Sequence, residues 1–301
     1  MKTIKLIIKL ICALVALVIV ALLTLNIAKF VIYGKYYRIK DNYCINPGLN
    51  HGAVPQGIAV DEERDIVLTS AYMKDKTASR IYVTNSKNKV HITELTKNGK
   101  AFTGHVGGIS LSGEYVYIAN NSKIYKISLE TIMNEDFVEI GEGIAVNNKA
   151  DFTFADDKYL YVGEFNYADH YVCENVIGDY KAICTKYSLD DLTTPLAIYS
   201  IRDKVQGFCV TDKGDIVLST SWSVADSLLY VYRNENIKQE GEYNGVPLYV
   251  LANEDEVIKA PAMSEDLSFS NGKVYTMFES ACNKYIFGKF FFANKVVGLE
   301  I

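Results

Sequence analysis

Residues 105–129 read HVGGISLSGEYVYIANNSKIYKISL, in which three apolar alternations are separated by two short polar turns. Strict alternation of apolar and polar residues is typical of β-strands, and turns rich in Gly, Asn and Ser between such runs indicate hairpins. The stretch therefore predicts three consecutive antiparallel strands. The first two of them form a phrase that can be searched for elsewhere in the chain.

The same strand–turn–strand phrase occurs five times, each time followed by a third strand. The five phrases are QGIAVDEERDIVLTS (56–70), HVGGISLSGEYVYIAN (105–120), DFTFADDKYLYVGE (151–164), QGFCVTDKGDIVLS (206–219) and EDLSFSNGKVYTMFE (265–279). The third strands are expected at 79–85, 123–129, 184–189, 228–233 and 295–301. Fourth strands are expected at 89–95, 137–143, 196–201 and 247–253.

The first residues of the five phrases are Gln56, His105, Asp151, Gln206 and Glu265, which follow one another at intervals of 49, 46, 55 and 59 residues. A four-stranded antiparallel unit that recurs near this period is the signature of a β-propeller blade. The sequence therefore predicts an all-β, five-bladed propeller, with six blades as the less favoured alternative. A β-sandwich would not require five copies of one phrase.

The fifth copy ends after its third strand, at Ile301, so a ring built from these copies needs one more strand. An unpaired sheet edge leaves backbone donors and acceptors unsatisfied. The segment YYRIKDNYCI (36–45) has suitable strand formers, and we expect it to close the last blade as its outer strand. The predicted organisation is an N-terminal tail and helix at 1–34 and a propeller at 35–301.

Residues 10–28 contain no charge and are long enough to span a hydrocarbon core of about 30 Å. We expect an uncleaved, single-pass signal anchor, with a cleaved signal peptide as the alternative. Lysines and arginines flank the run on both sides, so their count does not decide the orientation. The very short tail favours the N-terminus inside, which would place the propeller on the extracytoplasmic side of the cell membrane.

Charge and cysteine content narrow the function classes. The net charge is −5 and the lysines are spread along the chain, so a nucleic-acid partner has no support. Of the six cysteines, Cys173 and Cys184 flank the polar stretch CENVIGDYKAIC and are candidates for a disulfide. No C-x-x-C spacing is present, so a structural zinc site is not predicted.

Ligands of propellers usually bind where the innermost strands begin, so the first residues of the phrases should converge. The ends of the second strands should lie beside them, at Ser70, Asn120, Glu164, Ser219 and Glu279. The carboxylates of this combined set, Asp151, Glu164, Glu265 and Glu279, are candidate ligands for Ca²⁺ or Mg²⁺. Alternatively, these side chains bond one another, backbone amides and water, as buried polar groups must. His105 is a candidate general base.

The phrases PQGIAV (55–60), HVGGI (105–109), ADFTF (150–154), MSEDL (263–267) and VYTMFESACNKYIFG (274–288) resemble a family of secreted or membrane-anchored bacterial propellers. These proteins are loosely grouped with SMP-30/gluconolactonase-like and YVTN-repeat propellers, and the resemblance runs from about residue 53 to the end of the chain. It implies no established reaction. The lactonase relatives hold a divalent metal with an early Glu, and the matching position here is Gln56, a neutral amide.

Two functions of the channel remain open at this point, besides a scaffold in which the side walls of the blades, not the channel, meet a partner. The first is a binding module whose channel mouth takes a small polar ligand or an extracytoplasmic protein. The second is a divalent-metal-dependent, lactonase-like hydrolase that uses the same channel. The aromatic segment at 285–294 is expected to lie across the channel mouth, with contact to lipid or a partner as the alternative.

Overall fold

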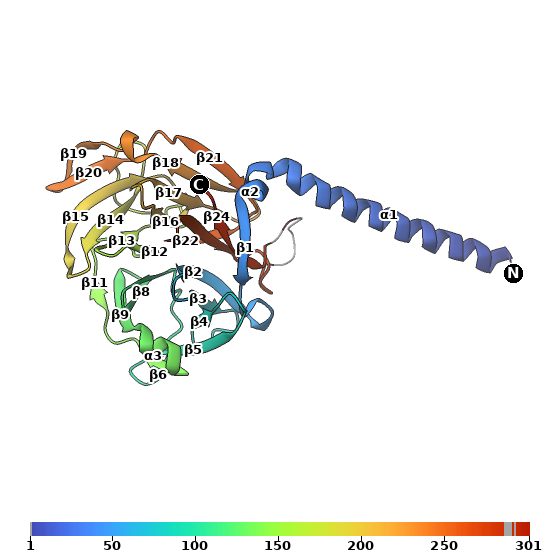
Figure 1. Cartoon of the computed structure of the whole chain (residues 1–301), viewed down its shortest axis with the longest axis horizontal. Coiled ribbons are helices and arrows are strands. Elements are labelled where there is room, and N and C mark those ends of the chain that lie inside the picture. The colour runs from blue at the N-terminus through green and yellow to red at the C-terminus, as the bar shows by residue number, and fades with distance from the viewer. Residues whose placement is uncertain (1, 286–290, 292) are drawn as a thin grey trace.

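The computed structural model describes residues 2–285, 291 and 293–301. Five sheets, each with four antiparallel strands, surround a common centre, and one long helix projects from the ring (Figure 1). The innermost strands contact one another in sequence around the ring, and the last of them contacts the first. The chain is therefore a five-bladed β-propeller, as its repeated phrase predicts. The aromatic segment at 285–294 falls largely outside the described residues.

Within each blade the chain runs from the innermost strand outward. Blade 1 contains β2 (Ala53–Asp61), β3 (Ile66–Met73), β4 (Arg80–Thr84) and β5 (Val90–Lys97). Blade 2 contains β7 (Gly108–Ser112), β8 (Tyr115–Asn120), β9 (Lys123–Ser128) and β11 (Ile144–Ala145). Blade 3 contains β12 (Phe152–Ala155), β13 (Tyr159–Gly163), β14 (Ala182–Ser188) and β15 (Asp191–Ile201).

The last two blades follow the same plan. Blade 4 contains β16 (Val205–Val210), β17 (Ile216–Thr220), β18 (Ser227–Tyr232) and β21 (Glu256–Ala260). Blade 5 contains β22 (Ser264–Ser270), β23 (Lys273–Phe278), β24 (Lys295–Leu299) and β1 (Lys40–Ile45). Short elements complete the chain: η1 (Leu49–His51), β6 (Lys100–Ala101), α3 (Leu129–Asn134), η2 (Asn234–Asn236) and β19 (Gln239–Tyr243).

The ring closes through β1, which pairs antiparallel with β24. Residues 40–45 form this strand, whereas 36–39 belong to the short helix α2 (Gly34–Ile39) because Tyr36 is buried there against Phe278. Side chains of β22 also bond β2 of the first blade. The hydroxyl of Ser268 accepts a hydrogen bond from the Val60 amide at 2.9 Å, and that of Ser270 accepts one from the Glu62 amide at 3.0 Å.

Two outer strands differ from the sequence expectation. Residues 137–143 were expected as the outer strand of blade 2, but β10 (Phe137–Glu139) pairs in parallel with β5 of blade 1. Residues 247–253 were expected as the outer strand of blade 4, but β20 (Val246–Val250) pairs in parallel with β15 of blade 3. In both cases the open edge of the preceding blade takes up the segment, because an unpaired edge accepts any suitable strand.

Close approach of the innermost strands explains the glycines of the repeated phrase. A Cβ on Gly57 would lie 2.5 Å from the Ile109 amide nitrogen, and one on Gly108 would lie 2.3 Å from that of Thr153. In both places a side chain would collide with the backbone of the next blade. These glycines therefore set the small diameter of the ring at one end.

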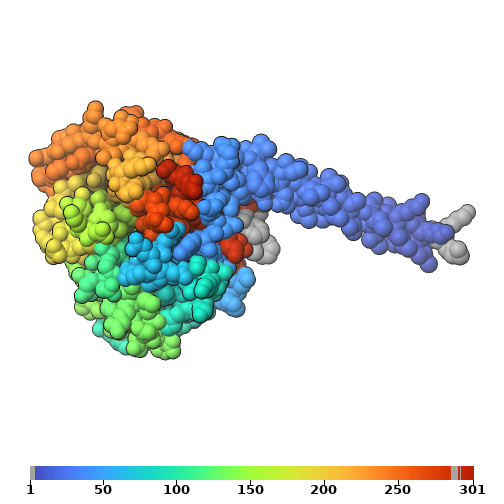
Figure 2. Space-filling view, viewed as in Figure 1, coloured from blue at the N-terminus to red at the C-terminus, as the bar shows by residue number. Residues whose placement is uncertain are grey.

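The projecting helix is α1 (Lys2–Ile32), which stands free of the rest of the chain in the space-filling view (Figure 2). Its segment Ile4–Ile32 contains an 18-residue window with a mean hydropathy of 3.2, and none of that window is buried, so by length and composition the segment fits a membrane span or a signal sequence. The Tyr33 hydroxyl donates to Asp226 at 2.6 Å, and Lys35 forms an ion pair with Glu256. These contacts attach the base of α1 to blade 4.

Candidate functional site

A cavity of about 640 Å³ opens at the end of the ring where the innermost strands begin, and we call this end the cavity mouth. Gln56, Gln206 and Glu265 lie near the first residues of β2, β16 and β22, while Asp151 immediately precedes β12. His105 lies three residues before β7. The innermost strands all run in the same direction along the axis, so these five residues meet at one end. All five line the cavity.

The ends of the second strands divide into three groups. Asn120 and Glu279 line the cavity. Ser70 and Ser219 are buried and bond the framework: Ser70 donates to the Val106 carbonyl at 2.8 Å, and Ser219 shares a 2.7 Å hydrogen bond with Ser264. Glu164 does not belong to the lining of this cavity and lines a smaller pocket of about 380 Å³ instead.

The surroundings of Glu164 explain its position. Glu164 is only 2% exposed. Its carboxylate accepts hydrogen bonds from the Asn175 side chain at 3.0 and 3.1 Å, the Ile183 amide at 3.2 Å and the Lys149 amide at 3.3 Å. Burial raises the pKa of this carboxyl, although the hydrogen bonds act in the opposite direction. Glu164 therefore ties the long connection 164–181 to blade 3.

The candidate disulfide is not formed. Cys173 and Cys184 are both buried free thiols. The Cys173 thiol donates to the Phe165 carbonyl at 3.4 Å, and its amide donates to Asn166 at 2.9 Å. Burial raises the pKa of Cys173 to about 12. The hydrogen bonds of Glu164 hold the connection that the disulfide was expected to staple.

The deepest charged group of the cavity is Glu265, whose side chain is 3% exposed. Burial and the neighbouring carboxyl groups of Glu279 and Asp266 raise its pKa well above the usual value. Glu279 accepts a hydrogen bond from the Gln56 side chain at 3.2 Å. Asp266 lies behind the cavity, where it accepts a hydrogen bond from the Leu267 amide at 3.0 Å, and burial raises its pKa as well.

Asp151 occupies the side of the cavity formed by blade 3. Its carboxylate accepts a hydrogen bond from the Phe165 amide at 2.8 Å, which fixes the chain where it leaves β13. Burial raises the pKa of Asp151, and the Phe165 amide and the charge of Lys149 oppose this shift. The Lys149 ammonium donates to the Val172 carbonyl and so braces the same connection.

Aromatic rings form two walls of the cavity. Trp222 forms the first wall with Phe165 and Tyr171, at ring-centroid distances of 5.9 and 5.7 Å, and Tyr167 stacks on Trp222 at 4.2 Å. We call Trp222, Phe165 and Tyr171 the tryptophan wall. Large flat rings of this kind supply contact area for the apolar part of a ligand.

The second wall contains Tyr72, Tyr285 and His105. The rings of Tyr72 and His105 stack at 4.9 Å, and the Lys284 ammonium lies 4.8 Å from the centre of the Tyr72 ring. The imidazole faces the open cavity, but the surrounding protein atoms and the charge of Lys284 lower its pKa to about 4. The lowered pKa favours the neutral form of the imidazole.

The carboxylates do not assemble into a metal shell. Among the described residues, no group of three or more His, Cys, Asp or Glu side chains is placed to hold a metal ion. Glu164 faces a different pocket, and Asp151 is committed to the Phe165 amide. The arrangement of the described residues therefore does not fit the Ca²⁺ or Mg²⁺ site expected from the sequence.

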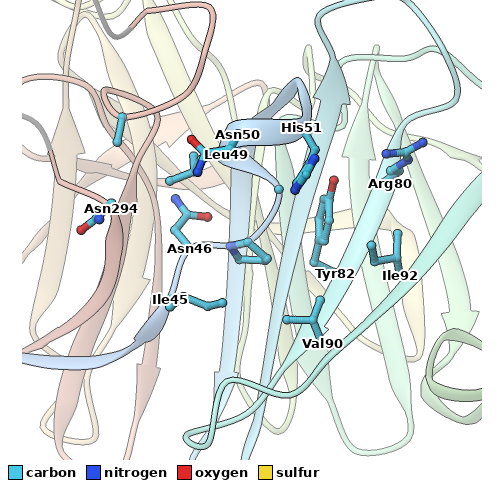
Figure 3. Close-up of a pocket in the computed structure, with 13 residues that line it drawn as sticks. Ile45, Asn46, Leu49, Asn50, His51, Arg80, Tyr82, Val90, Ile92 and Asn294 are labelled. Carbon is cyan, nitrogen blue, oxygen red and sulfur yellow. The ribbon is translucent and has the colours of Figure 1, made fainter.

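Another pocket, of about 680 Å³, lies between blades 1 and 5 (Figure 3). Figure 3 shows Tyr82 and Val90 on the strands of blade 1 facing Asn46, which follows β1. The Asn46 side-chain amide donates to the Phe278 carbonyl at 3.1 Å, and Arg80 pairs with Glu94 at 2.7 Å. The Asn46 carbonyl oxygen and the Tyr82 hydroxyl, by contrast, are buried without a hydrogen-bond partner among the described residues.

Sequence reasoning missed the aromatic walls except for Tyr285, which belongs to the segment 285–294 that was expected across the channel mouth. Phe165 directly follows the second strand of its phrase at Glu164, Tyr72 lies two residues beyond Ser70, and Trp222 lies three residues beyond Ser219. An aromatic residue just past the end of the second strand in three of five copies is a signal that could have been found. The predicted site residues at the ends of these second strands lie one to three positions before the aromatic residues.

Comparison with known proteins gives similarity of fold only. No family model and no curated protein matches the chain. Solved structures that are similar include the PQQ-bound aldose sugar dehydrogenase of Streptomyces coelicolor, with 16% identity, coverage of 80% of this chain and 77% of that one, and a TM-score of 0.45. Hydrazine synthase of Kuenenia stuttgartiensis has 8% identity, coverage of 75% and 55%, and a TM-score of 0.38.

The N-terminal domain of Nup159 is a further structure of this kind, with 10% identity, coverage of 80% and 57%, and a TM-score of 0.32. Similarity at this level transfers no residue role and no ligand to this chain. The propeller architecture is established, whereas the specific likeness to gluconolactonase-like propellers gains no support from these three structures.

Proposed function

We propose that this chain is a membrane-anchored, extracytoplasmic binding module that takes a small polar ligand into the central cavity. The observation that carries the proposal is the convergence of side chains from all five blades on one cavity of about 640 Å³. Pockets for small ligands typically enclose about 300–1,000 Å³ and combine apolar walls with a few converging polar groups. The aromatic walls and the amides and carboxylates between them meet this description.

The attachment of α1 supports the membrane part of the proposal. Only Tyr33 separates α1 from α2, and the contacts of Tyr33 and Lys35 with blade 4 fix this junction. A propeller joined in this way stays close to the bilayer. We further propose that the N-terminus of α1 lies inside, which places the cavity outside the cytoplasm.

A direct binding measurement tests the ligand part. The full chain in detergent is titrated with polyols, alkylammonium salts, carboxylates and neutral amides, while thermal unfolding and tryptophan emission are followed. Trp222 is the only tryptophan, so its emission reports on the cavity. We expect at least one class to raise the melting temperature and change the emission, because a ligand of the folded state stabilises it. If no class does either, the proposal is wrong.

A pair of variants localises the effect. Gln206→Leu removes one amide from the cavity, and we expect the responding ligand to bind about two- to tenfold more weakly. Glu63→Gln changes a residue at the opposite end of the ring and should leave binding unaltered. Equal effects of the two variants would place the ligand elsewhere.

The orientation is tested separately with C-terminal fusions in a bacterial host. We expect alkaline phosphatase, which folds only outside the cytoplasm, to be active when fused after Ile301. A fusion to a cytoplasmic reporter should be inactive. The reverse pattern would contradict the extracytoplasmic location without affecting the binding proposal.

A further inference from the structure

The chemical class of the ligand can be narrowed from the state of Glu265. This residue is the second of β22, it lines the cavity, and its side chain is 97% buried, since only 3% remains exposed. Across residues 2–285, 291 and 293–301, no hydrogen bond or ion pair to its carboxylate is present. A buried acceptor without a donor is unfavourable, and a buried carboxylate more so than a neutral group.

The other acidic groups near Glu265 do have donors. Asp151 accepts a hydrogen bond from the Phe165 amide at 2.8 Å, Glu279 accepts one from Gln56 at 3.2 Å, and Asp266 accepts one from the Leu267 amide at 3.0 Å. The fold therefore satisfies the carboxylates around Glu265 but leaves Glu265 itself facing the cavity. A donor that arrives with the ligand would complete its bonding.

The sign of the lining favours a positively charged donor. The described lining contains the acidic side chains of Asp151, Glu265 and Glu279 and the basic side chain of Lys149, and the Lys284 ammonium lies against the Tyr72 ring at the second wall. The Lys149 ammonium is already bonded to the Val172 carbonyl. A cationic group beside Glu265 would offset like charges that otherwise repel one another.

The tryptophan wall suits the same kind of ligand. The face of an aromatic ring attracts a cation, tryptophan more strongly than tyrosine or phenylalanine. Trp222, Phe165 and Tyr171 line the cavity that contains Glu265, so one ligand can contact both. Because the described residues form no metal shell, a bare metal ion is not the cation that this arrangement fits.

We propose that the cavity binds an organic cation, a primary ammonium or guanidinium group on a small body, whose nitrogen donates to the Glu265 carboxylate and whose body contacts the tryptophan wall. This inference rests on the proposed function, because it assigns a ligand class to the same cavity. It involves no covalent step.

Three probes of nearly the same shape test the inference on the full chain in detergent: benzylammonium, neutral benzyl alcohol and anionic benzoate. Binding is measured by isothermal titration calorimetry and by Trp222 emission. We expect benzylammonium to bind at least about tenfold more tightly than benzyl alcohol, and benzoate to bind least. Glu265→Gln should remove the preference, whereas Glu63→Gln, which neutralises one charge at the other end of the ring, should retain it.

A second variant keeps the test decisive if Glu265→Gln does not fold. Trp222→Leu should weaken benzylammonium binding about two- to tenfold by calorimetry, since it removes the aromatic face. Equal affinity for benzylammonium and benzyl alcohol, or a preference that survives in Glu265→Gln, would overturn the inference. Tighter binding of benzyl alcohol or benzoate would also overturn it while leaving the cavity as a binding site. Failure of all three probes overturns the cation class, whereas the proposed function fails only if the wider set of ligands also gives no response.

Discussion

Glu265 at the cavity mouth and the bonded acidic residues at the other end of the ring are in opposite states. At the end opposite the cavity mouth, the hairpin turns of all five blades surround a depression of about 490 Å³, and we call this end the turn mouth. Asp61 pairs there with Arg64 at 2.6 Å, and Asp156 accepts backbone amides at 2.7 and 2.8 Å. At the cavity mouth, Glu265 accepts no hydrogen bond from any residue that the structure describes.

The pKa shifts express the same contrast. Partial burial acts against ionisation of Asp61, but its bonds with Arg64 outweigh burial and lower its pKa. Burial and the neighbouring carboxyl groups raise the pKa of Glu265. Ionised Asp61 at the turn mouth therefore stabilises the folded chain, whereas Glu265 destabilises it when ionised. A group that is retained despite such a penalty is a candidate for function rather than structure.

The lengths of the connections explain how the two ends come to differ. At the turn mouth the innermost strand joins the second strand through a short turn, such as 113–114 in blade 2. At the cavity mouth blade 3 inserts residues 164–181 between β13 and β14, and this insertion supplies Phe165 and Tyr171. Long connections can carry walls and lids, whereas tight turns satisfy their own side chains.

The substitution with the largest expected effect on stability forces the innermost strands apart. In Gly108→Ala the new Cβ would lie 2.3 Å from the Thr153 amide nitrogen, against backbone that cannot move aside. We expect a loss of about 3 kcal/mol or more in the free energy of unfolding. Denaturant unfolding of the detergent-solubilised chain measures it.

A matched control lies in the same blade at the turn mouth. Gly113 has a φ of 56°, and a Cβ on this residue would have no atom within 4 Å, so Gly113→Ala introduces only backbone strain. That change should cost about 1–2 kcal/mol. If both variants lose the same free energy of unfolding, the close approach at Gly108 does not set the spacing of the innermost strands.

A substitution with an intermediate effect on stability tests whether Glu265 retains its proton in the folded chain. Its raised pKa means that the folded chain retains a proton that the unfolded chain releases, so its contribution to stability is complete below the usual value of 4.5 and is lost as the pH rises through the folded pKa. Glu265→Gln abolishes this loss. We expect the variant to be more stable than the wild type by about 1–3 kcal/mol at pH 8 and nearly equal to it at pH 4.

Thermal unfolding of both proteins without ligand, from pH 4 to pH 8, gives the comparison. Asp266 also has a raised pKa, but it is present in both proteins and its effect cancels to first order. A wild type that matches or exceeds the variant at pH 8 would mean that Glu265 has a stabilising partner when ionised.

The sequence predicted the inner part of the molecule better than its rim. Five copies of a two-strand phrase repeat because each must present the same surfaces to two neighbouring blades, and residues such as Gly57 and Gly108 record that packing. The outer strands have one free edge, so β10 and β20 joined the blade that precedes their expected one. A local pattern identifies a strand there but not its partner.

The sequence also predicted only part of the site. The first residues of the innermost strands converge because the repeat fixes their height along the axis. Glu164 has the corresponding position in its own phrase, yet its carboxylate turns to Asn175 and Ile183 in the long connection that follows. No repeat encodes such a contact, because the connection occurs in one blade.

The smallest expected effect comes from Asp61→Asn at the turn mouth, where the sign of the pH dependence should reverse. A lowered pKa gives a contribution that is present above the usual value of 3.8 and lost as the pH falls through the folded pKa. Since the pair with Arg64 is partly exposed, the variant should lose less than about 1 kcal/mol at pH 7 and match the wild type near pH 2. Thermal unfolding across this range is the measurement, with Glu63→Gln as a control that removes a charge from the same end of the ring. A variant that gains stability on neutralisation, as expected for Glu265→Gln, would remove the distinction between the two ends.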